Sequence, residues 1–213
     1  TPNGDAVEDY CGICITSNNE SSCGTSTYFD GINDYVSFGN LDLLNFGNED
    51  FTLMGWMKTE VSSSFPSAFI SKRETCNHSS FFNSFIFEGK LGFVVDQDAN
   101  STNYNQNFGE IIIADGVWHH FAFTRSGATT NIYVDGQLDN SNTEMGTANI
   151  SNNGNFLLGT DPCVDSSVRG YYSGFVDNLS VWNTALSINN IKEFIQNEPS
   201  YSEGYLIGSW ENL

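Results

Sequence analysis

Apolar and polar residues alternate in short runs along most of this chain. The run from 51 to 58, FTLMGWMK, places Phe51, Leu53 and Gly55 on one side of an extended strand, and in the run from 130 to 134 Ile132 and Val134 oppose Tyr133. A period of two residues predicts half-buried β-strands. The same pattern predicts strands at 28–30, 35–38, 51–58, 68–71, 82–87, 91–95, 110–114, 118–125, 130–134, 156–159, 174–182 and 205–210.

Turn and helix signals are few and well defined. Asp135-Gly136 is a two-residue hairpin signal that joins the apolar run before it to Gln137 and Leu138. Only the segment 187–197 has a helical pattern, with Ser187 as the N-cap. Its apolar residues form one stripe and are Ile188, Ile191, Phe194 and Ile195. These signals predict an all-β fold with one short C-terminal helix.

Composition agrees with many short strands in one domain. The chain has 213 residues, of which 14% are aromatic and 15% charged, and it contains 20 glycines. All-β sandwiches of this size commonly form single domains, so one hydrophobic core is expected. No apolar run approaches the roughly 18 residues that span a bilayer, so no membrane insertion is expected. No signal peptide is recognised, which suggests a mature or excised form.

The charge balance restricts the partners of this chain. It contains 26 acidic residues and only 7 Lys plus Arg, which gives a formal net charge of −19 and a pI near 4.1. Phosphate backbones and anionic lipid surfaces repel such a protein, so nucleic acid is excluded as a partner. Most carboxylates are expected to keep the protein soluble. A subset is expected to hold a cation.

Four blocks of sequence in a fixed order resemble a known family. They are YFDGINDYVSF at 28–38, FTLMGWMK at 51–58, DGVWHHFAFTRSG with NIYVDGQL between 115 and 138, and GYYSGFVDNLSVWNTALSINNIKEF at 170–194. Together they resemble the laminin G-like, concanavalin A-like jelly roll, in its pentraxin-like branch. The resemblance implies a two-sheet antiparallel jelly-roll sandwich over residues 27–213. The polar residues 1–26 are expected to form a cysteine-containing N-terminal arm.

Five cysteines, Cys11, Cys14, Cys23, Cys76 and Cys163, suggest disulfides and an oxidising compartment. An odd count leaves one thiol and about fifteen possible arrangements, among which the residues alone do not choose. The resemblance implies that the loops after 69–74 and after 156–161 lie side by side at a ligand-binding rim. It therefore implies a bond between Cys76 and Cys163. The CGIC pair is expected to be structural, because no βαβ pattern surrounds it.

Calcium is the metal that the acidic loops would suit, because it binds six to eight oxygen ligands. The resemblance implies a calcium site at the rim with Glu74 and Asp161. This chain has Asp161-Pro162-Cys163 where pentraxins have a denser run of acidic residues. The alternative is that a disulfide has replaced the metal there. It implies a second site where the first and penultimate strands meet, with Asp30, Asp177 and the nearby Asp34. The alternative there is that the aspartates cap turns.

Sugar recognition requires aromatic faces beside planar polar groups. Residues of both kinds gather in the loops that the resemblance places at the rim, and the expected ligand-binding set is Asn77, His78, Tyr104, Asp165, Arg169, Tyr171 and Tyr172. Consecutive tyrosines on a strand point to opposite faces, so one of the pair must leave the core. Arg169 is either an ion-pair anchor or a contact for a carboxylated or sulfated ligand, and Trp182 is expected in the core.

Catalytic patterns are missing from the sequence. Glycoside hydrolases of this fold need two carboxylates close together on one strand, and their Glu, Asp, Glu spacing is absent, as is a GxSxG elbow. We therefore expect a non-catalytic, calcium-binding, carbohydrate-binding (lectin-like) or adhesion module of a larger secreted or cell-surface protein. The alternative is a protein-interaction or spacer module of the same fold, in which the rim contacts a cell-surface protein instead of a glycan.

Overall fold

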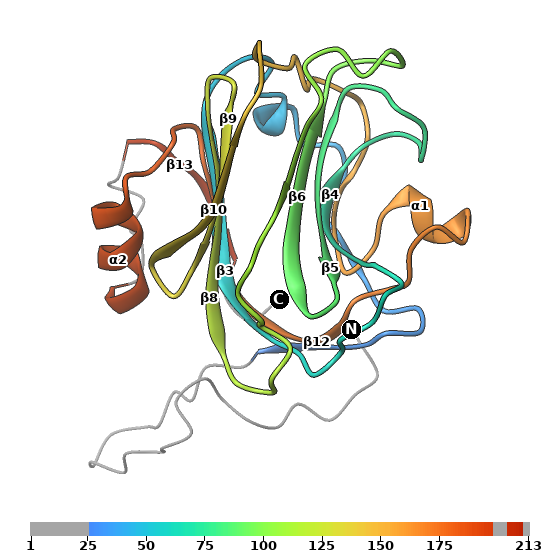
Figure 1. Cartoon of the computed structure of the whole chain (residues 1–213), viewed down its shortest axis with the longest axis vertical. Helices are drawn as coiled ribbons and strands as arrows, with labels where there is room; N and C mark the ends of the chain where they lie inside the picture. Colours follow the sequence, from blue (N-terminus) through green and yellow to red (C-terminus); the bar gives the residue numbers. More distant parts are fainter. Residues whose placement is uncertain (1–25, 198–203, 211–213) are drawn as a thin grey trace.

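Two antiparallel sheets pack face to face in the computed structural model, which describes residues 26–197 and 204–210 (Figure 1). One sheet has seven strands in the order β1 (Thr27–Asp30), β12 (Ser173–Trp182), β3 (Phe51–Lys58), β8 (His119–Ser126), β9 (Thr129–Val134) and β10 (Gln137–Thr143), with β13 (Leu206–Trp210) also paired to β12. The other has six strands in the order β2 (Val36–Ser37), β11 (Phe156–Leu158), β4 (Ser67–Lys72), β5 (Phe81–Phe87), β6 (Lys90–Asp96) and β7 (Asn105–Phe108). The predicted antiparallel sandwich is confirmed.

The main core lies between the two sheets and is rich in phenylalanine. Phe51, Phe93 and Phe123 are each fully buried, and the rings of Phe93 and Phe123 stack with centroids 5.0 Å apart. Alternation along each strand sends every second side chain into this layer. On β5, for example, Phe82 and Ile86 point into the core between the sheets.

Helix α2 (Ile188–Gln196) covers the outer face of the seven-stranded sheet (Figure 1). The Ser187 hydroxyl accepts a hydrogen bond from the Asn190 backbone N–H, so the predicted N-cap is confirmed. Ile191 is buried against this sheet, and Phe194 stacks on Trp182 with centroids 4.7 Å apart. Trp182 is 1% exposed, as expected for a core residue.

The outer face of the six-stranded sheet carries the side chains that form the candidate site. Phe81, Asn83 and Phe85 alternate with the core residues of β5 and therefore share this face. Phe81 and Phe85 are buried together with Val94 of β6, although they lie outside the main core. Helix α1 (Pro162–Asp165), which the sequence pattern did not predict, lies beside this sheet, on the side of β4 and β5 (Figure 1). A short 3-10 helix, η1 (Asp42–Leu44), completes the elements.

The prediction of a strand at 110–114 is wrong, and β7 instead forms an edge of the six-stranded sheet. The Asp139 carboxylate accepts hydrogen bonds from the backbone N–H groups of Glu110 and Ile111, which holds this segment as a loop. In β7 the amides of Asn105 and Asn107 donate to backbone carbonyls of the opposite sheet. These cross-sheet bonds pair the amide N–H donors of two buried side chains.

The predicted N-terminal arm, with Cys11, Cys14 and Cys23, lies outside the described residues, so its structure and its pairing stay predictions. Within the described part of the chain, no helix is both long enough and apolar enough to cross a bilayer.

Candidate functional site

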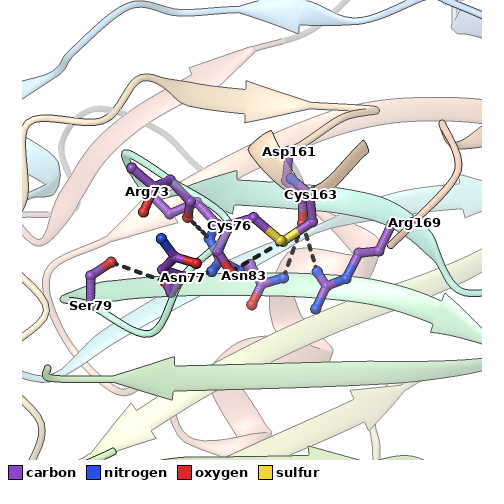
Figure 2. Close-up of a disulfide and its surroundings, with 9 residues drawn as sticks. Arg73, Cys76, Asn77, Ser79, Asn83, Asp161, Cys163 and Arg169 are labelled. Atoms are coloured by element: carbon purple, nitrogen blue, oxygen red, sulfur yellow. Dashed lines mark hydrogen bonds and ion pairs between the residues drawn. A yellow bond between two sulfur atoms is a disulfide. The ribbon is translucent and has the colours of Figure 1, made fainter. Parts of the chain in front are cut away.

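A disulfide joins the loop that follows β4 to helix α1 over the outer face of the six-stranded sheet (Figure 2). Its partners are Cys76 and Cys163, whose Cα atoms lie 4.6 Å apart. The predicted pairing is confirmed. The bond closes a segment with a sequence separation of 87 residues, so two loops distant in the chain are fixed against each other.

Asp161 is the N-cap residue of α1. Its Oδ1 accepts a hydrogen bond of 2.8 Å from the Cys163 backbone N–H, and Pro162 occupies the first turn. An aspartate N-cap followed by proline is a common way to begin a helix. The other oxygen, Oδ2, accepts from Arg169 Nη1 at 2.6 Å in an ion pair whose carboxylate is fully buried. Of the two roles predicted for Arg169, ion pairing is therefore confirmed.

Two arginines stack on two of the phenylalanines of β5. The guanidinium of Arg73 lies 3.9 Å from the ring centroid of Phe81, and that of Arg169 lies 4.7 Å from the centroid of Phe85. Such cation–π contacts hold planar guanidinium groups in defined orientations. Arg73 also donates from Nε to the Thr75 carbonyl and from Nη2 to the Asn77 carbonyl, so it shapes the loop that carries Cys76.

Asn83 lies on the strand between the two stacked pairs. Its side chain is fully buried and points toward Asp161 and Arg169 (Figure 2). With the amide oxygen turned to the guanidinium, Asn83 accepts hydrogen bonds from both Nη atoms of Arg169. The floor of the site therefore carries an amide between two cations.

These side chains enclose a pocket of about 140 Å³. Its lining comes from both cross-linked loops, from β5 and β6, and from Tyr104 before β7, and consists of Arg73, Cys76, His78, Phe81, Asn83, Val94, Tyr104, Cys163, Val168 and Arg169. The volume is below the roughly 300 Å³ at which typical small-molecule sites begin. The pocket therefore suits one functional group or part of a single sugar ring.

Burial dominates the electrostatics of this pocket. It lowers the pKa of Arg73 to about 10; Asp161 and Asp96 oppose this effect, and the neighbouring Arg169 guanidinium adds to it. Burial also raises the pKa of Tyr104, with the negative charge of Asp96 acting in the same direction. At the rim, His78 Nδ1 lies 2.5 Å from Oδ2 of Asp96, whose side chain is fully buried.

The structure brings together some of the predicted ligand residues and leaves others outside the pocket. His78, Tyr104 and Arg169 line the pocket with both cysteines. Three others do not line it: exposed Asn77 and Asp165, and half-buried Tyr171.

The prediction that Tyr172 contacts a ligand is wrong. The side chain is 1% exposed and packs against Phe29 and Phe69 in the main core. Its hydroxyl donates toward the carbonyls of Lys58 and Phe175. The physical reason is strand parity, because Tyr172 falls on the same side of the chain as the buried Val176. Tyr171 is the member of the pair that leaves the core.

Strand register does not support the predicted calcium site between the first and penultimate strands. Asp30 faces Ser173 on β12, whereas Asp177 lies four residues further along that strand. At about 3.3 Å per residue the two aspartates are about 13 Å apart along the sheet, while oxygens bound to one calcium lie within about 5 Å of each other. The prediction that Asp30 and Asp177 share one ion is wrong. Asp30 caps its turn through bonds from Ile32 and Asn33, and Asp34 accepts from the Asp30 N–H.

The rim carboxylates do not form a calcium site with each other either. Glu74 is exposed and accepts from the Asn153 backbone N–H at 2.8 Å, while both oxygens of Asp161 hold Cys163 and Arg169. In residues 26–197 and 204–210, no group of three or more His, Cys, Asp or Glu side chains is placed to hold a metal ion. Calcium binding by these residues does not fit the donor arrangement.

Sequence reasoning missed Arg73, Asn83 and Val168 as parts of the site. One signal was available, because Asn83 has the same parity as Phe81 and Phe85 and is an amide between two aromatics on one face. Arg73 and Val168 gave no such signal, because their place depends on how the two loops fold over the sheet.

Comparison with known proteins identifies the family of this chain. Residues 29–192 match a laminin G family model described as the concanavalin A-like lectin/glucanases superfamily. The chain belongs to this superfamily. A curated relative, "Sushi, von Willebrand factor type A, EGF and pentraxin domain-containing protein 1" of Rattus norvegicus, is 28% identical over 95 residues. That match covers 41% of this chain and 3% of the rat protein.

Two solved structures show the same fold at low sequence identity. The native heptameric SAP-like pentraxin from Limulus polyphemus has a TM-score of 0.58 at 16% identity, over 86% of this chain and 92% of that one. Domain 4 of AbnA, an extracellular arabinanase from Geobacillus stearothermophilus, was solved in complex with arabinotriose. It has a TM-score of 0.58 at 18% identity, over 81% of this chain and 77% of that one.

Proposed function

We propose that this chain is a non-catalytic, lectin-like module of a larger extracellular protein, and that the pocket over β5 binds a sugar. The observation that carries the proposal is the pocket itself, in which buried amide and guanidinium donors lie beside aromatic rings. Sugar sites combine such planar polar groups with apolar faces. Tyr104 and His78 at the rim supply the aromatic side, with their ring centroids 5.4 Å apart.

The loops around the pocket are held in place before any ligand binds. The disulfide links them, the Asp161–Arg169 pair anchors one, and Arg73 holds the other through two backbone carbonyls. Rigid loops lose little conformational entropy on binding, which favours ligands that make few contacts.

The pocket lacks the groups that sugar hydrolysis requires. None of its ten lining residues is Asp or Glu, whereas glycoside hydrolases place two carboxylates beside the scissile bond. Binding without catalysis is consistent with the arabinotriose complex of the similar AbnA domain and with the many modules in the name of the rat relative.

A blocking substitution at the pocket mouth tests this proposal. Val168 lines the pocket and is 52% exposed, while Val117 is 53% exposed and lies outside it. We expect Val168→Trp to fill the mouth and weaken binding to glycans found on an array by at least about tenfold, because the indole occupies the ligand's place. Val117→Trp, the matched control, should bind as the parent does. Both melting temperatures should stay within about 2 °C of the parent.

Two results would overturn the proposal. An array on which the parent binds no glycan, neutral or acidic, would remove the sugar-binding function and favour the protein-interaction alternative. Equal glycan binding by Val168→Trp and the parent would move the site away from this pocket.

A further inference from the structure

The charge of the pocket is opposite to that of the chain. The protein carries a formal net charge of −19, yet its pocket is lined by two of the seven basic residues, a histidine and no carboxylate. Two of the other basic residues, Lys72 and Arg125, are buried and bond to backbone carbonyls as loop anchors. A concentration of cations in one small pocket of so acidic a protein requires an explanation.

The two pocket arginines keep donors for a ligand. A guanidinium has five N–H donors. Within the described residues, Arg73 donates hydrogen bonds to the carbonyls of Thr75 and Asn77. Arg73 is 4% exposed, and its guanidinium has no carboxylate within ion-pairing distance among the described residues. Arg169 shares its charge with Asp161. Asp96 contacts His78 at the rim, so Arg73 is left as the pocket guanidinium that makes no ion pair among the described residues.

We propose that this pocket selects an acidic sugar, with its single negative charge, a carboxylate or a sulfate ester, seated between Arg73 and Arg169 over the Asn83 amide. This inference rests on the proposed sugar-binding function and names the ligand class of the same site. Arginine forks recognise such oxyanions through paired, charge-assisted hydrogen bonds. A neutral sugar leaves the buried Arg73 charge without a partner, whereas an anion compensates it.

Polyanions do not fit the same argument. The pocket holds one functional group, and the surrounding surface of the chain is acidic, so an extended phosphate or sulfate polymer meets repulsion beyond the pocket. At physiological ionic strength charges screen over about 8 Å, so a monosaccharide in the pocket meets mainly the charges that line it. Binding should therefore be measured near 0.15 M salt.

The test compares three sugars of similar size by calorimetry or ligand-observed NMR: methyl glucuronide, glucose 6-sulfate and neutral methyl glucoside. We expect at least one acidic sugar to bind at least about tenfold more tightly than methyl glucoside, as charge-assisted bonds predict. The preferred acid distinguishes a carboxylate from a sulfate ester. Equal affinity for the neutral and both acidic sugars would overturn the inference and leave the sugar-binding function intact.

Charge substitutions at the pocket mouth supply the second readout. Val168→Asp should bind the acidic sugar about three- to tenfold more weakly than Val168→Asn does, because the two side chains have the same shape and only Asp repels the anion. Val117→Asp, with the same change at a matched exposed site, should have no effect. Equal binding by Val168→Asp and Val168→Asn would overturn the inference.

The role of Arg169 is tested without leaving its buried partner Asp161 unpaired. Because Asp161 is buried, Arg169→Gln is combined with Asp161→Asn, which removes both charges together. We expect this double variant to show a smaller preference for the acidic sugar over methyl glucoside, because Arg73 alone then donates to the anion. An unchanged preference in a folded double variant would overturn the assignment of Arg169.

Discussion

Adjacent tyrosines give a sharp test of the core that supports the site. Tyr172 is 1% exposed, whereas Tyr171 is half-buried. We expect Tyr172→Ala to lower the free energy of unfolding by about 3 to 5 kcal/mol, the range for truncating a large buried aromatic. Tyr171→Ala should lower it by less than about 1 kcal/mol.

The magnitude for Tyr172 follows from its contacts. Its ring lies 4.9 Å from that of Phe69 and 5.7 Å from that of Phe29, so truncation opens a cavity that neither neighbour can close. The hydroxyl contributes separately, because its one proton is shared between the carbonyls of Lys58 and Phe175. Tyr172→Phe keeps the ring and removes only these bonds, which should cost about 1 to 2 kcal/mol.

Urea denaturation followed by tryptophan fluorescence measures these differences, with the disulfide kept oxidised in every variant. Unchanged denaturant slopes would show that the variants unfold in the same way. Equal destabilisation by Tyr171→Ala and Tyr172→Ala would refute the assignment of Tyr172 to the core. A cost below about 1 kcal/mol for Tyr172→Ala would refute the packing argument itself.

Three further outcomes follow from the structure. Replacing Cys76 and Cys163 together by serine should lower the free energy of unfolding by up to about 4 to 5 kcal/mol, the chain-entropy value for so long a loop, and a loss below 1 kcal/mol in urea would contradict it. Burial lowers the pKa of His120 to about 4 in the folded protein. Below pH 6.5 the unfolded chain therefore binds a proton that the folded chain does not, and the free energy of unfolding should fall by up to about 3 kcal/mol as the pH drops from 6.5 to 4. An equal fall in His120→Gln would contradict this. Adding calcium should shift the melting temperature of the parent and of the double variant Asp30→Asn, Glu74→Gln equally, within about 1 °C. A shift that occurs in the parent and is lost in the double variant would show that these carboxylates bind calcium.

Much of the sandwich was predictable from local pattern. The run from 51 to 58 is strand β3 with the same bounds, because a largely apolar run that includes Phe51, Thr52 and Trp56 lies between polar turns. The helix was predictable because Ser187 caps it and an apolar stripe packs it on the sheet. Strand β7 was not, because Asn105 and Asn107 have low strand propensity and are held by bonds to the opposite sheet.

The site was predictable only in part, since it depends on loops meeting across the fold. The disulfide was inferred from a family resemblance rather than from the residues alone, and it brought the correct two loops together. Tyr172 shows a signal that was present and not used, because its parity matches that of buried Val176. The partner of Arg169 had no such signal. Asp161 lies eight residues away, and only the turn of α1 brings its carboxylate to the guanidinium.

Stability and binding share the same groups in this pocket, and this decides which variants are informative. Arg169 neutralises a fully buried carboxylate, so removing it alone leaves Asp161 without its partner and is expected to weaken α1 before any ligand is considered. Arg73 carries the same ambiguity, because its bonds to Thr75 and Asn77 shape the cross-linked loop. Val168 has neither role and still lines the pocket. A charge introduced at Val168 therefore changes what the ligand meets and leaves the anchors of the loops in place, so a change in binding there reports on recognition rather than on folding.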